Sequence, residues 1–119
     1  MELLNKIQKE LNVGKTLHNK FGNYYYRSAE QILEAVKPLL GKGILTLSDE
    51  VALIGQRYYV KSTATLKDGG ESVMVSAFAR ETETRKGMDE SQVTGSTSSY
   101  ARKYALNGLF CIDDTKDSD

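Results

Sequence analysis

The chain has 119 residues, 39% of them hydrophobic, and its 16 basic and 16 acidic side chains give no net charge, so a single domain with its own core is expected. One cysteine, Cys111, excludes an internal disulfide, and one cysteine with one histidine excludes the usual four-ligand zinc sites. No apolar run approaches the ~18 residues of a membrane helix and no signal peptide is visible, so we expect a cytoplasmic protein without a membrane partner.

Two helices are predicted in the N-terminal half. Leucine and isoleucine residues fall on one stripe of residues 2–11, as in an amphipathic helix. The second helix begins after Ser28, which is spaced from Gln31 as in a capping box, and runs to about Leu40. Pro38 lies near its end and is expected to kink or stop it.

Three consecutive tyrosines precede the second helix and favour an extended backbone. Alternation places Tyr24 and Tyr26 on one side and Tyr25 on the other. Two interpretations are open. We prefer packing within the chain or against another subunit, and the alternative is stacking of nucleic-acid bases on the rings.

Three strands follow, at residues 44–54, 57–67 and 71–82. The first contains a polar interruption at Ser48–Glu50. Asp68-Gly69-Gly70 is a hairpin turn signal between the second and third strands. The pattern therefore predicts an antiparallel sheet that contains a ββ-hairpin.

A charged loop over residues 83–91 leads to the last helix, which Ser91 can cap and which runs to about Asn107, with Gly108 as its terminator. The predicted order is ααβββα. The fold class is therefore α+β, with a three-stranded antiparallel sheet packed on a long C-terminal helix and with helices at the N-terminus.

One face of the predicted hairpin mixes basic and aromatic side chains. Alternation places Tyr59 of the second strand and Phe78 of the third among basic residues. Such a mixture suits a groove for single-stranded nucleic acid, although a half-exposed sheet whose cations extend to solvent explains it as well. The basic residues, two of them from the following loop, are Arg57, Lys61, Arg80, Arg85 and Lys86.

The last helix carries a narrow polar stripe beside a more apolar face that we expect to pack on the sheet. Every residue from 94 to 99 is Ser, Thr or Gly, and these are poor helix formers. Their cost to the helix indicates a contact, because small hydroxyl residues allow a phosphate backbone to approach closely. An ordinary solvated face is the alternative. The stripe consists of Gln92, Ser96, Ser99, Lys103 and Asn107, with Arg102 at its border, and the apolar face of Val93, Thr97, Tyr100, Ala101 and Tyr104.

The last seven residues hold four aspartates and one lysine, which leaves 15 basic and 12 acidic residues, a net charge of +3, in residues 1–112. We interpret residues 113–119 as an acidic tail, since the aspartates lack the spacing of an EF-hand. The alternative is a cation site of a metal-dependent nuclease. No Walker motif is present, which argues against ATP-driven strand exchange.

The segment QVTGSTSSYARKYALNGLFCIDD, residues 92–114, resembles the signature of the ERF (essential recombination function) family of phage single-strand annealing proteins. The segment FGNYYYRSAEQILEAVKPLLGKGI, residues 21–44, resembles an earlier segment of the same family. The two segments occur in the family's order and bracket most of the chain.

The resemblance implies a fold like that of the eukaryotic recombination-mediator annealing proteins, in which a β-hairpin sheet packs on a long helix. It also implies rings or filaments of subunits, with DNA in a basic groove beside the helix. Tyr100 and Tyr104 are expected to brace the helix. The residues expected at or near the groove are Gln92, Thr94, Gly95, Ser96, Ser99, Arg102 and Lys103.

The expected function is therefore ATP-independent binding and annealing of single-stranded DNA in phage homologous recombination, by an oligomer without catalytic residues, cofactor or metal. Residues 1–112 are the expected annealing core and residues 113–119 the acidic tail. Expected partners are single-stranded DNA, further copies of the chain, and host or phage replication and recombination proteins. The alternative is a single-stranded DNA-binding protein that protects strands without annealing them.

Overall fold

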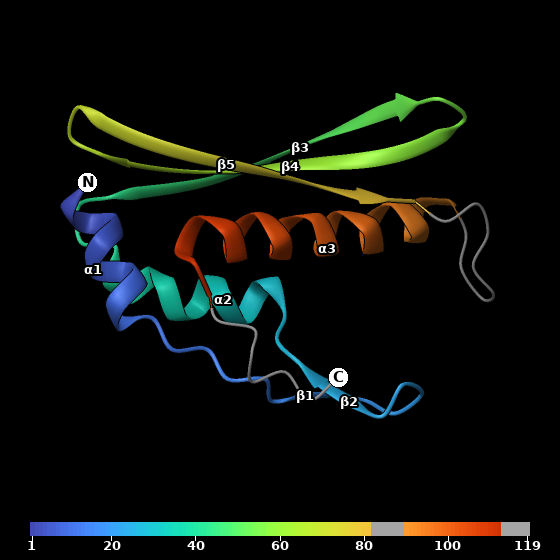
Figure 1. Ribbon diagram of the computed structural model, residues 1–119, viewed down its shortest axis with the longest axis horizontal. Coiled ribbons are helices and arrows are strands. Elements are labelled where there is room, and N and C mark those ends of the chain that lie inside the picture. Colours follow the sequence, from blue (N-terminus) through green and yellow to red (C-terminus); the bar gives the residue numbers. More distant parts are fainter. Residues whose placement is uncertain (82–89, 113–119) are drawn as a thin grey trace.

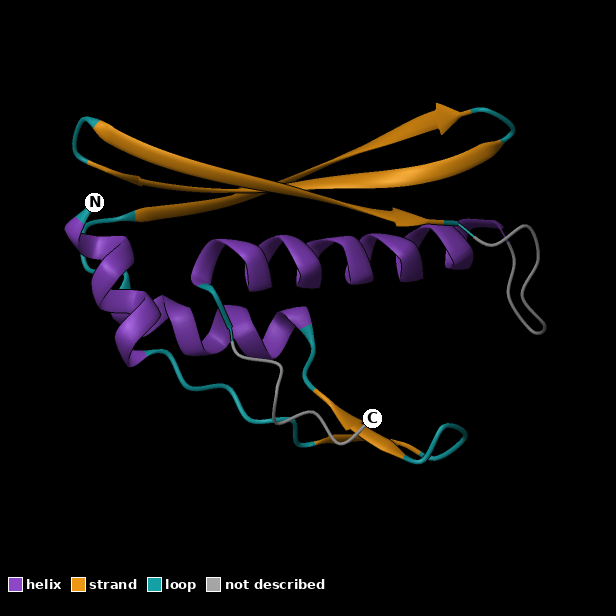
Figure 2. Cartoon of the chain, viewed as in Figure 1, coloured by secondary structure: helices purple, strands orange, loops and turns teal. Residues whose placement is uncertain are grey.

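The computed structural model of the chain describes residues 1–81 and 90–112, without the side chains of residues 90–92. It confirms the predicted α+β class (Figure 2). No helix within these ranges combines the length and apolarity needed to span a bilayer. In chain order the elements are α1 (Glu2–Glu10), β1 (Leu17–Asn19), β2 (Tyr24–Tyr26), α2 (Ala29–Val36), the 3-10 turn η1 (Lys37–Leu39), β3 (Ile44–Ile54), β4 (Arg57–Asp68), β5 (Glu71–Arg80) and α3 (Glu90–Phe110).

The elements form layers around the long helix α3 (Figure 1). The antiparallel sheet, in the order β3-β4-β5, covers one side of α3 along its length. On the other side, α2 lies beneath the C-terminal half of α3, with α1 beside it, and the small β1–β2 hairpin lies beneath the N-terminal half. The sequence does not predict this hairpin. It predicts only an extended backbone at Tyr24–Tyr26, which is here the strand β2 paired with β1.

The sheet follows from alternation and from two glycine turns. Val60, Ser62, Ala64 and Leu66 of β4 are buried toward α3, and the residues that alternate with them face away from it. Gly55 and Gly69 have φ angles of +64° and +61°, which glycine adopts readily, and each starts the turn between paired strands. The predicted hairpin turn is thereby confirmed, and β3 runs without interruption through its polar segment.

Small residues bring α3 close to the sheet. Ala101 and Ala105 are fully buried, and a Cβ atom at Gly108 would lie 2.9 Å from Cγ1 of Val75. The prediction that Gly108 terminates the helix is therefore wrong: close packing requires a glycine there, and α3 continues to Phe110. The helix ends where Cys111 adopts a φ of +51°.

The second helix begins as predicted. The backbone N–H of Gln31 donates to Oγ of Ser28 at 3.1 Å, and the backbone N–H of Ser28 donates to Oε1 of Gln31 at 3.0 Å, which completes the capping box. Regular α-helix ends at Val36, and Pro38 lies in the 3-10 turn that follows. Just before the cap, buried Arg27 donates from Nε to the carbonyl of Val13 at 3.0 Å, which ties α2 to the segment after α1.

Candidate nucleic-acid interface

The polar stripe predicted on α3 lies on the side of the helix away from the sheet. Because Val93, Thr97 and Ala101 are buried against the sheet, the positions half a turn away face outward. Ser99 is exposed there, and Ser96 and Lys103 are half-buried. The hydroxyl of Ser99 donates to the carbonyl of Gly95 at 3.2 Å, so it remains at the helix surface with its lone pairs available as acceptors.

Gly95 is exposed within α3, and its role is not explained by contacts within the described part of the chain. A Cβ atom at this position would meet nothing within 4 Å. Glycine in a helix interior costs about 1 kcal/mol relative to alanine, so the residue destabilises α3 without a packing reason visible in the described residues. Close approach of another molecule would explain it.

Tyr100 and Tyr104 do not pack under the sheet as predicted. Their exposed fractions are 43% and 49%, and their rings stack on one another with centroids 6.3 Å apart and planes inclined by 28°. The physical reason is the close approach of α3 to the sheet through Ala101, Ala105 and Gly108, which leaves no room for large rings. The tyrosine pair therefore lies on the flank of the helix, beside the polar stripe.

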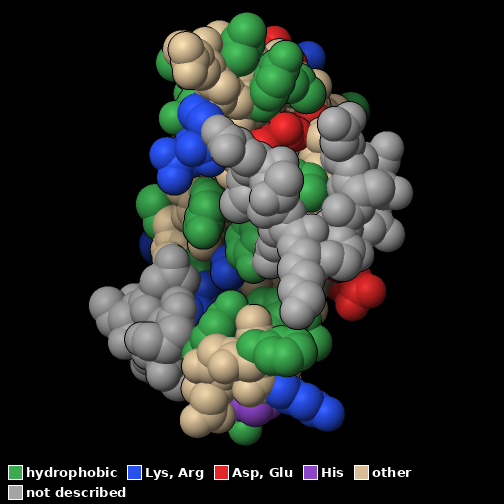
Figure 3. All heavy atoms as spheres, turned by 90° about the vertical axis from the view of Figure 1, so that its right-hand side faces the viewer, with side chains coloured by type: hydrophobic (Ala, Val, Ile, Leu, Met, Phe, Trp, Pro, Cys, Tyr) green, Lys and Arg blue, Asp and Glu red, His purple; other side chains and the backbone are tan. Residues whose placement is uncertain are grey.

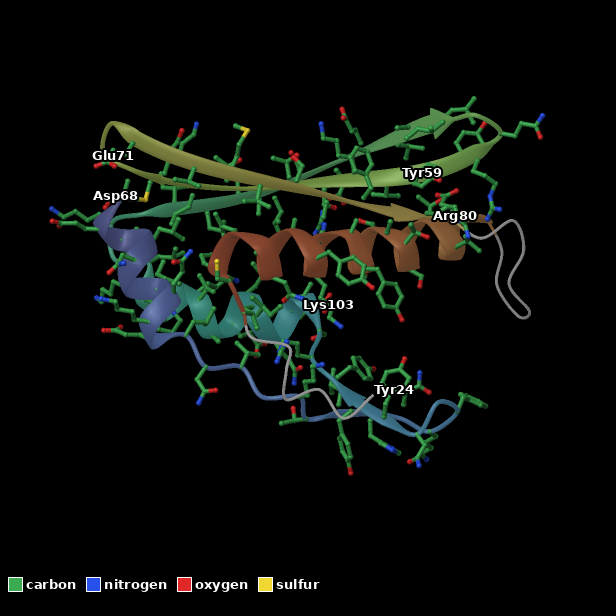
Figure 4. The ribbon with its side chains drawn as sticks, viewed as in Figure 1. Tyr24, Tyr59, Asp68, Glu71, Arg80 and Lys103 are labelled. Atoms are coloured by element: carbon green, nitrogen blue, oxygen red, sulfur yellow. The ribbon has the colours of Figure 1, made fainter. Side chains whose placement is uncertain are left out.

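The β1–β2 hairpin faces the side of α3 that lies away from the sheet (Figure 4). Nζ of Lys103 lies 6.0 Å from the ring centroid of Tyr26, within the range of a cation–π contact. The Tyr24 ring is 6.0 Å from that of Tyr26, and its hydroxyl accepts a hydrogen bond of 3.0 Å from Nδ2 of Asn19. Tyr25, on the opposite side of β2, contacts His18 instead.

We call this region the helix–hairpin surface. In the space-filling view, hydrophobic and basic side chains lie next to one another between the sheet layer and the hairpin (Figure 3). The surface brings together hydroxyl groups, aromatic rings and a cation from two elements. It is defined by Ser96, Ser99, Tyr100, Lys103 and Tyr104 of α3 and by Tyr26 of β2.

Arg102 points to a different place from its neighbour Lys103. Its Nε donates to Oδ2 of Asp49 in β3 at 2.9 Å, so its charge is paired at the junction of helix and sheet. The same carboxylate accepts hydrogen bonds from the hydroxyls of Ser62, at 2.6 Å, and Ser98. Successive residues of a helix are rotated by 100°, so the two cations face different sides of α3.

The pKa of Asp49 reflects these contacts. Burial raises the pKa of the carboxyl, but the hydrogen bonds from Ser62, Ser98 and Arg102, together with the charge of Arg102, outweigh burial and lower it below its ordinary value. Asp49 is therefore an ionised acceptor that joins β3, β4 and α3. Sequence reasoning missed this contact because Asp49 and Arg102 are 53 residues apart.

The basic residues predicted on the strands lie on the face of the sheet away from α3, and the predicted mixture with aromatics is confirmed. Tyr59 pairs across the strands with Arg80, and Lys61 with Phe78. Nζ of Lys61 is 5.9 Å from the Phe78 ring and 3.7 Å from a carboxylate oxygen of Glu50. We call Tyr59, Lys61, Phe78 and Arg80 the outer sheet surface.

The remaining predicted site residues are distributed around these two surfaces. Arg57, on the same strand as Lys61, donates from Nη2 to the carbonyl of Glu81 at 3.1 Å, and Thr94 donates to the Glu81 carboxylate at 2.6 Å. Arg85, Lys86 and the acidic tail lie outside the described residues, as does the side chain of Gln92. The sheet thus separates the predicted cations of the strands from Lys103 of the helix.

Comparison with known proteins agrees with the two motifs found in the sequence. The Essential recombination function protein of Salmonella phage P22 is 63% identical to this chain over 116 residues, which are 98% of this chain and 57% of that protein. The chain thus spans little more than half the length of this curated relative. No solved structure matches. A family model described as the ERF superfamily matches residues 1–119, and with this relative it establishes that the chain belongs to the ERF superfamily.

Proposed function

We propose that the chain binds single-stranded DNA and anneals complementary strands without ATP, as an oligomer that acts in phage recombination in the cytoplasm of the bacterial host. The observation that carries the proposal is the exposed side of α3, where Gly95, hydroxyl groups and Lys103 stand together in a member of the ERF superfamily. Host or phage recombination proteins are its proposed partners.

Annealing needs no chemical step, so the proposal requires no catalytic residue, cofactor or metal. Base pairing itself supplies ~1.4 kcal/mol per stacked step. The protein has to remove two obstacles, which are hairpins within each strand and repulsion between two polyanions. A surface that holds phosphates while base edges remain accessible removes both.

The helix–hairpin surface is the proposed main contact with the sugar–phosphate chain. Lys103 offers a cation, and Ser96 and Ser99 offer hydroxyl groups, the types of group that contact phosphates. The Ser99 hydroxyl would exchange its donation to the Gly95 carbonyl for one to a phosphate oxygen. Arg102 contributes less than we expect from sequence, because its charge is paired with Asp49. Lys61 and Arg80 of the outer sheet surface, with Arg57, are proposed as secondary contacts on the opposite side of the sheet.

One subunit of this kind would bind weakly, since residues 1–112 carry a net charge of only +3, with 15 basic and 12 acidic residues. Repetition of the same contact around an oligomer multiplies the affinity without new chemistry. Modest affinity per subunit also allows the product duplex to dissociate.

The test compares Lys103→Gln with Lys9→Gln, a matched loss of one lysine on the exposed side of α1. Affinity for a fluorescent single-stranded oligonucleotide is measured by anisotropy at several salt concentrations, and annealing by the pairing rate of complementary strands. Only Lys103→Gln should weaken binding, slow annealing and reduce the salt slope by about 0.7, the value for one lost phosphate contact. Equal behaviour of the two variants would contradict the assignment.

The exposed tyrosine pair favours one alternative function, a protein that binds and protects single strands without annealing them. The pairing assay separates the two functions. An annealing protein accelerates pairing of complementary strands, whereas a protective protein slows it.

A further inference from the structure

The two tyrosines of α3 keep a large part of their side-chain surface exposed in the described structure. Tyr100 and Tyr104 expose 43% and 49% of their surface and contact each other one helical turn apart. Burial of such a ring is normally one of the larger favourable terms in folding, so two neighbouring rings that are each nearly half exposed offer apolar surface for a contact with another molecule. The core beside them is built from Ala101 and Ala105, so these rings do not fill it.

The side chains around the tyrosine pair indicate which kind of molecule would bind to it. Lys103 lies between the two tyrosines in sequence and extends toward Tyr26 of the facing hairpin, and Ser96 precedes Tyr100 by one turn. Flat apolar faces, a cation and a hydroxyl therefore occur within about two and a half helical turns. A nucleotide offers the matching groups, a flat base and a phosphate, and every base has a face that stacks on an aromatic ring.

The geometry of the pair also indicates how a base would lie. The two ring centroids are 6.3 Å apart, the spacing of aromatic rings in direct contact, so a base would stack on the outer side of the pair and not between the rings. Stacking uses the face of a base and leaves its hydrogen-bonding edge accessible. The arrangement is thus compatible with annealing as well as with binding.

We propose that Tyr100 and Tyr104 form a nucleobase-stacking platform, on which a single strand held at Lys103 places the faces of its bases. The platform rests on the proposed function, because it assigns a second kind of contact to the same DNA-binding surface. It replaces the expected bracing role of the two tyrosines with a direct contact to the ligand.

The experiment uses two fluorescent probes of equal length, a thymidine oligonucleotide and an abasic oligonucleotide with the same phosphate chain. The test variant is Tyr100→Leu with Tyr104→Leu, and the conservative variant is the corresponding pair of phenylalanine substitutions. The control is Tyr25→Leu, which removes a tyrosine of similar exposure, 50%, from the opposite side of β2. Affinities are measured by anisotropy, with the salt slope for each protein.

The leucine variant is expected to lose about 5-fold or more in affinity for the thymidine probe, in line with the loss of one stacked base. Its affinity for the abasic probe and its salt slope should stay unchanged, because stacking releases no counterions. The phenylalanine variant, which keeps the rings, and the Tyr25→Leu control should bind both probes as the wild type does.

Two results would overturn the platform while the proposed function stands. In the first, the wild type binds both probes equally and the leucine variant matches it. In the second, the leucine variant loses affinity for both probes to the same extent, as expected of a structural defect. If the wild type binds neither probe, the proposed function fails and the platform fails with it.

Discussion

Asp49 is a polar link between α3 and the sheet. Its carboxylate, on β3, accepts hydrogen bonds from Ser62 of β4 and from Ser98 and Arg102 of α3. A carboxylate that accepts several hydrogen bonds, one of them from a cation, is held more firmly than an exposed ion pair. Together with the close packing of Ala101 and Ala105, this contact holds α3 in a rotation that turns Lys103 toward the hairpin and not toward the sheet.

The substitution Asp49→Asn should lower the free energy of unfolding by about 1–3 kcal/mol near neutral pH, because it removes charge-assisted hydrogen bonds. The pKa of Asp49 is lowered in the folded state, so its stabilisation is complete above the unfolded value near 3.8 and is lost as pH falls through the folded value. Urea unfolding at decreasing pH should show the wild type and the variant converging below about pH 3.8.

The control for this comparison is Glu50→Gln, which alters the next residue of β3, on the exposed side of the sheet where it pairs with Lys61 at 3.7 Å. An exposed pair of this kind contributes at most about 1 kcal/mol. A difference between wild type and Asp49→Asn that persists unchanged at low pH would rule out the proposed role of the carboxylate.

At the scale of the element, α3 contains two glycines in opposite situations. Gly95 faces solvent, and Gly108 lies against Val75 of β5. We expect Gly95→Ala to raise the free energy of unfolding by about 1 kcal/mol, because alanine favours the helix. The same change at Gly108 should lower it, since a Cβ atom would lie 2.9 Å from Cγ1 of Val75. Thermal and urea unfolding of both variants measure these two opposite changes in the free energy of unfolding.

Strand affinity adds a functional measurement to the same pair of variants. If a sugar–phosphate chain approaches α3 closely at Gly95, the alanine variant should be more stable and yet bind single-stranded DNA more weakly. A more stable variant with unchanged affinity would show that this glycine does not mark the contact.

The parts of the fold that sequence predicts are those set by local chemistry. The capping box of Ser28 and Gln31, the glycine turn after β4 and the alternation along β4 each depend on residues close in the chain. For α3, the sequence predicts correctly that Val93, Thr97 and Ala101 lie against the sheet, but not that Tyr100 and Tyr104 are exposed. Their exposure follows from the close approach of the helix through the small residues Ala101 and Ala105, which leaves no room for large rings against the sheet.

The β1–β2 hairpin and the pairing of Arg102 are the features of the site that sequence could not reveal. The strand Leu17–Asn19 has three residues and no β-branched side chain, so it gives no periodic signal. The contact of Arg102 with Asp49 links residues far apart in the chain. The residue types of the site can therefore be predicted in part from the sequence. Their division between the helix–hairpin surface and the outer sheet surface can be seen only in the tertiary structure.

At the scale of the whole molecule, the far end of the β3–β4 hairpin leaves large apolar side chains uncovered. Leu53 exposes 59% of its surface, and Val51, Ile54 and Tyr58 expose more than half of theirs. Exposed apolar residues gathered in this way are typical of contacts between proteins. The oligomer in the proposed function requires such a contact with a second copy.

We expect Leu53→Glu to shift the protein toward smaller species in sedimentation velocity while the free energy of unfolding changes by no more than about 0.5 kcal/mol, as for most surface substitutions. Met74→Glu is the matched control, because Met74 exposes 64% of its surface near the opposite end of the sheet. If both variants sediment as the wild type does, the end of the β3–β4 hairpin does not take part in contacts between subunits.

The two halves of α3 differ in their surroundings, and this difference has a consequence for the backbone. Leu106, Leu109 and Phe110 are buried in the core shared with α1 and α2, whereas the half around Ser99 has the sheet on one side. In deuterated water, amides of the N-terminal half should exchange their hydrogens sooner, because opening there disrupts fewer buried contacts. A strand bound at the helix–hairpin surface would slow exchange over residues 96–104 but not over residues 106–110, so one helix contains both the reporter and its internal reference.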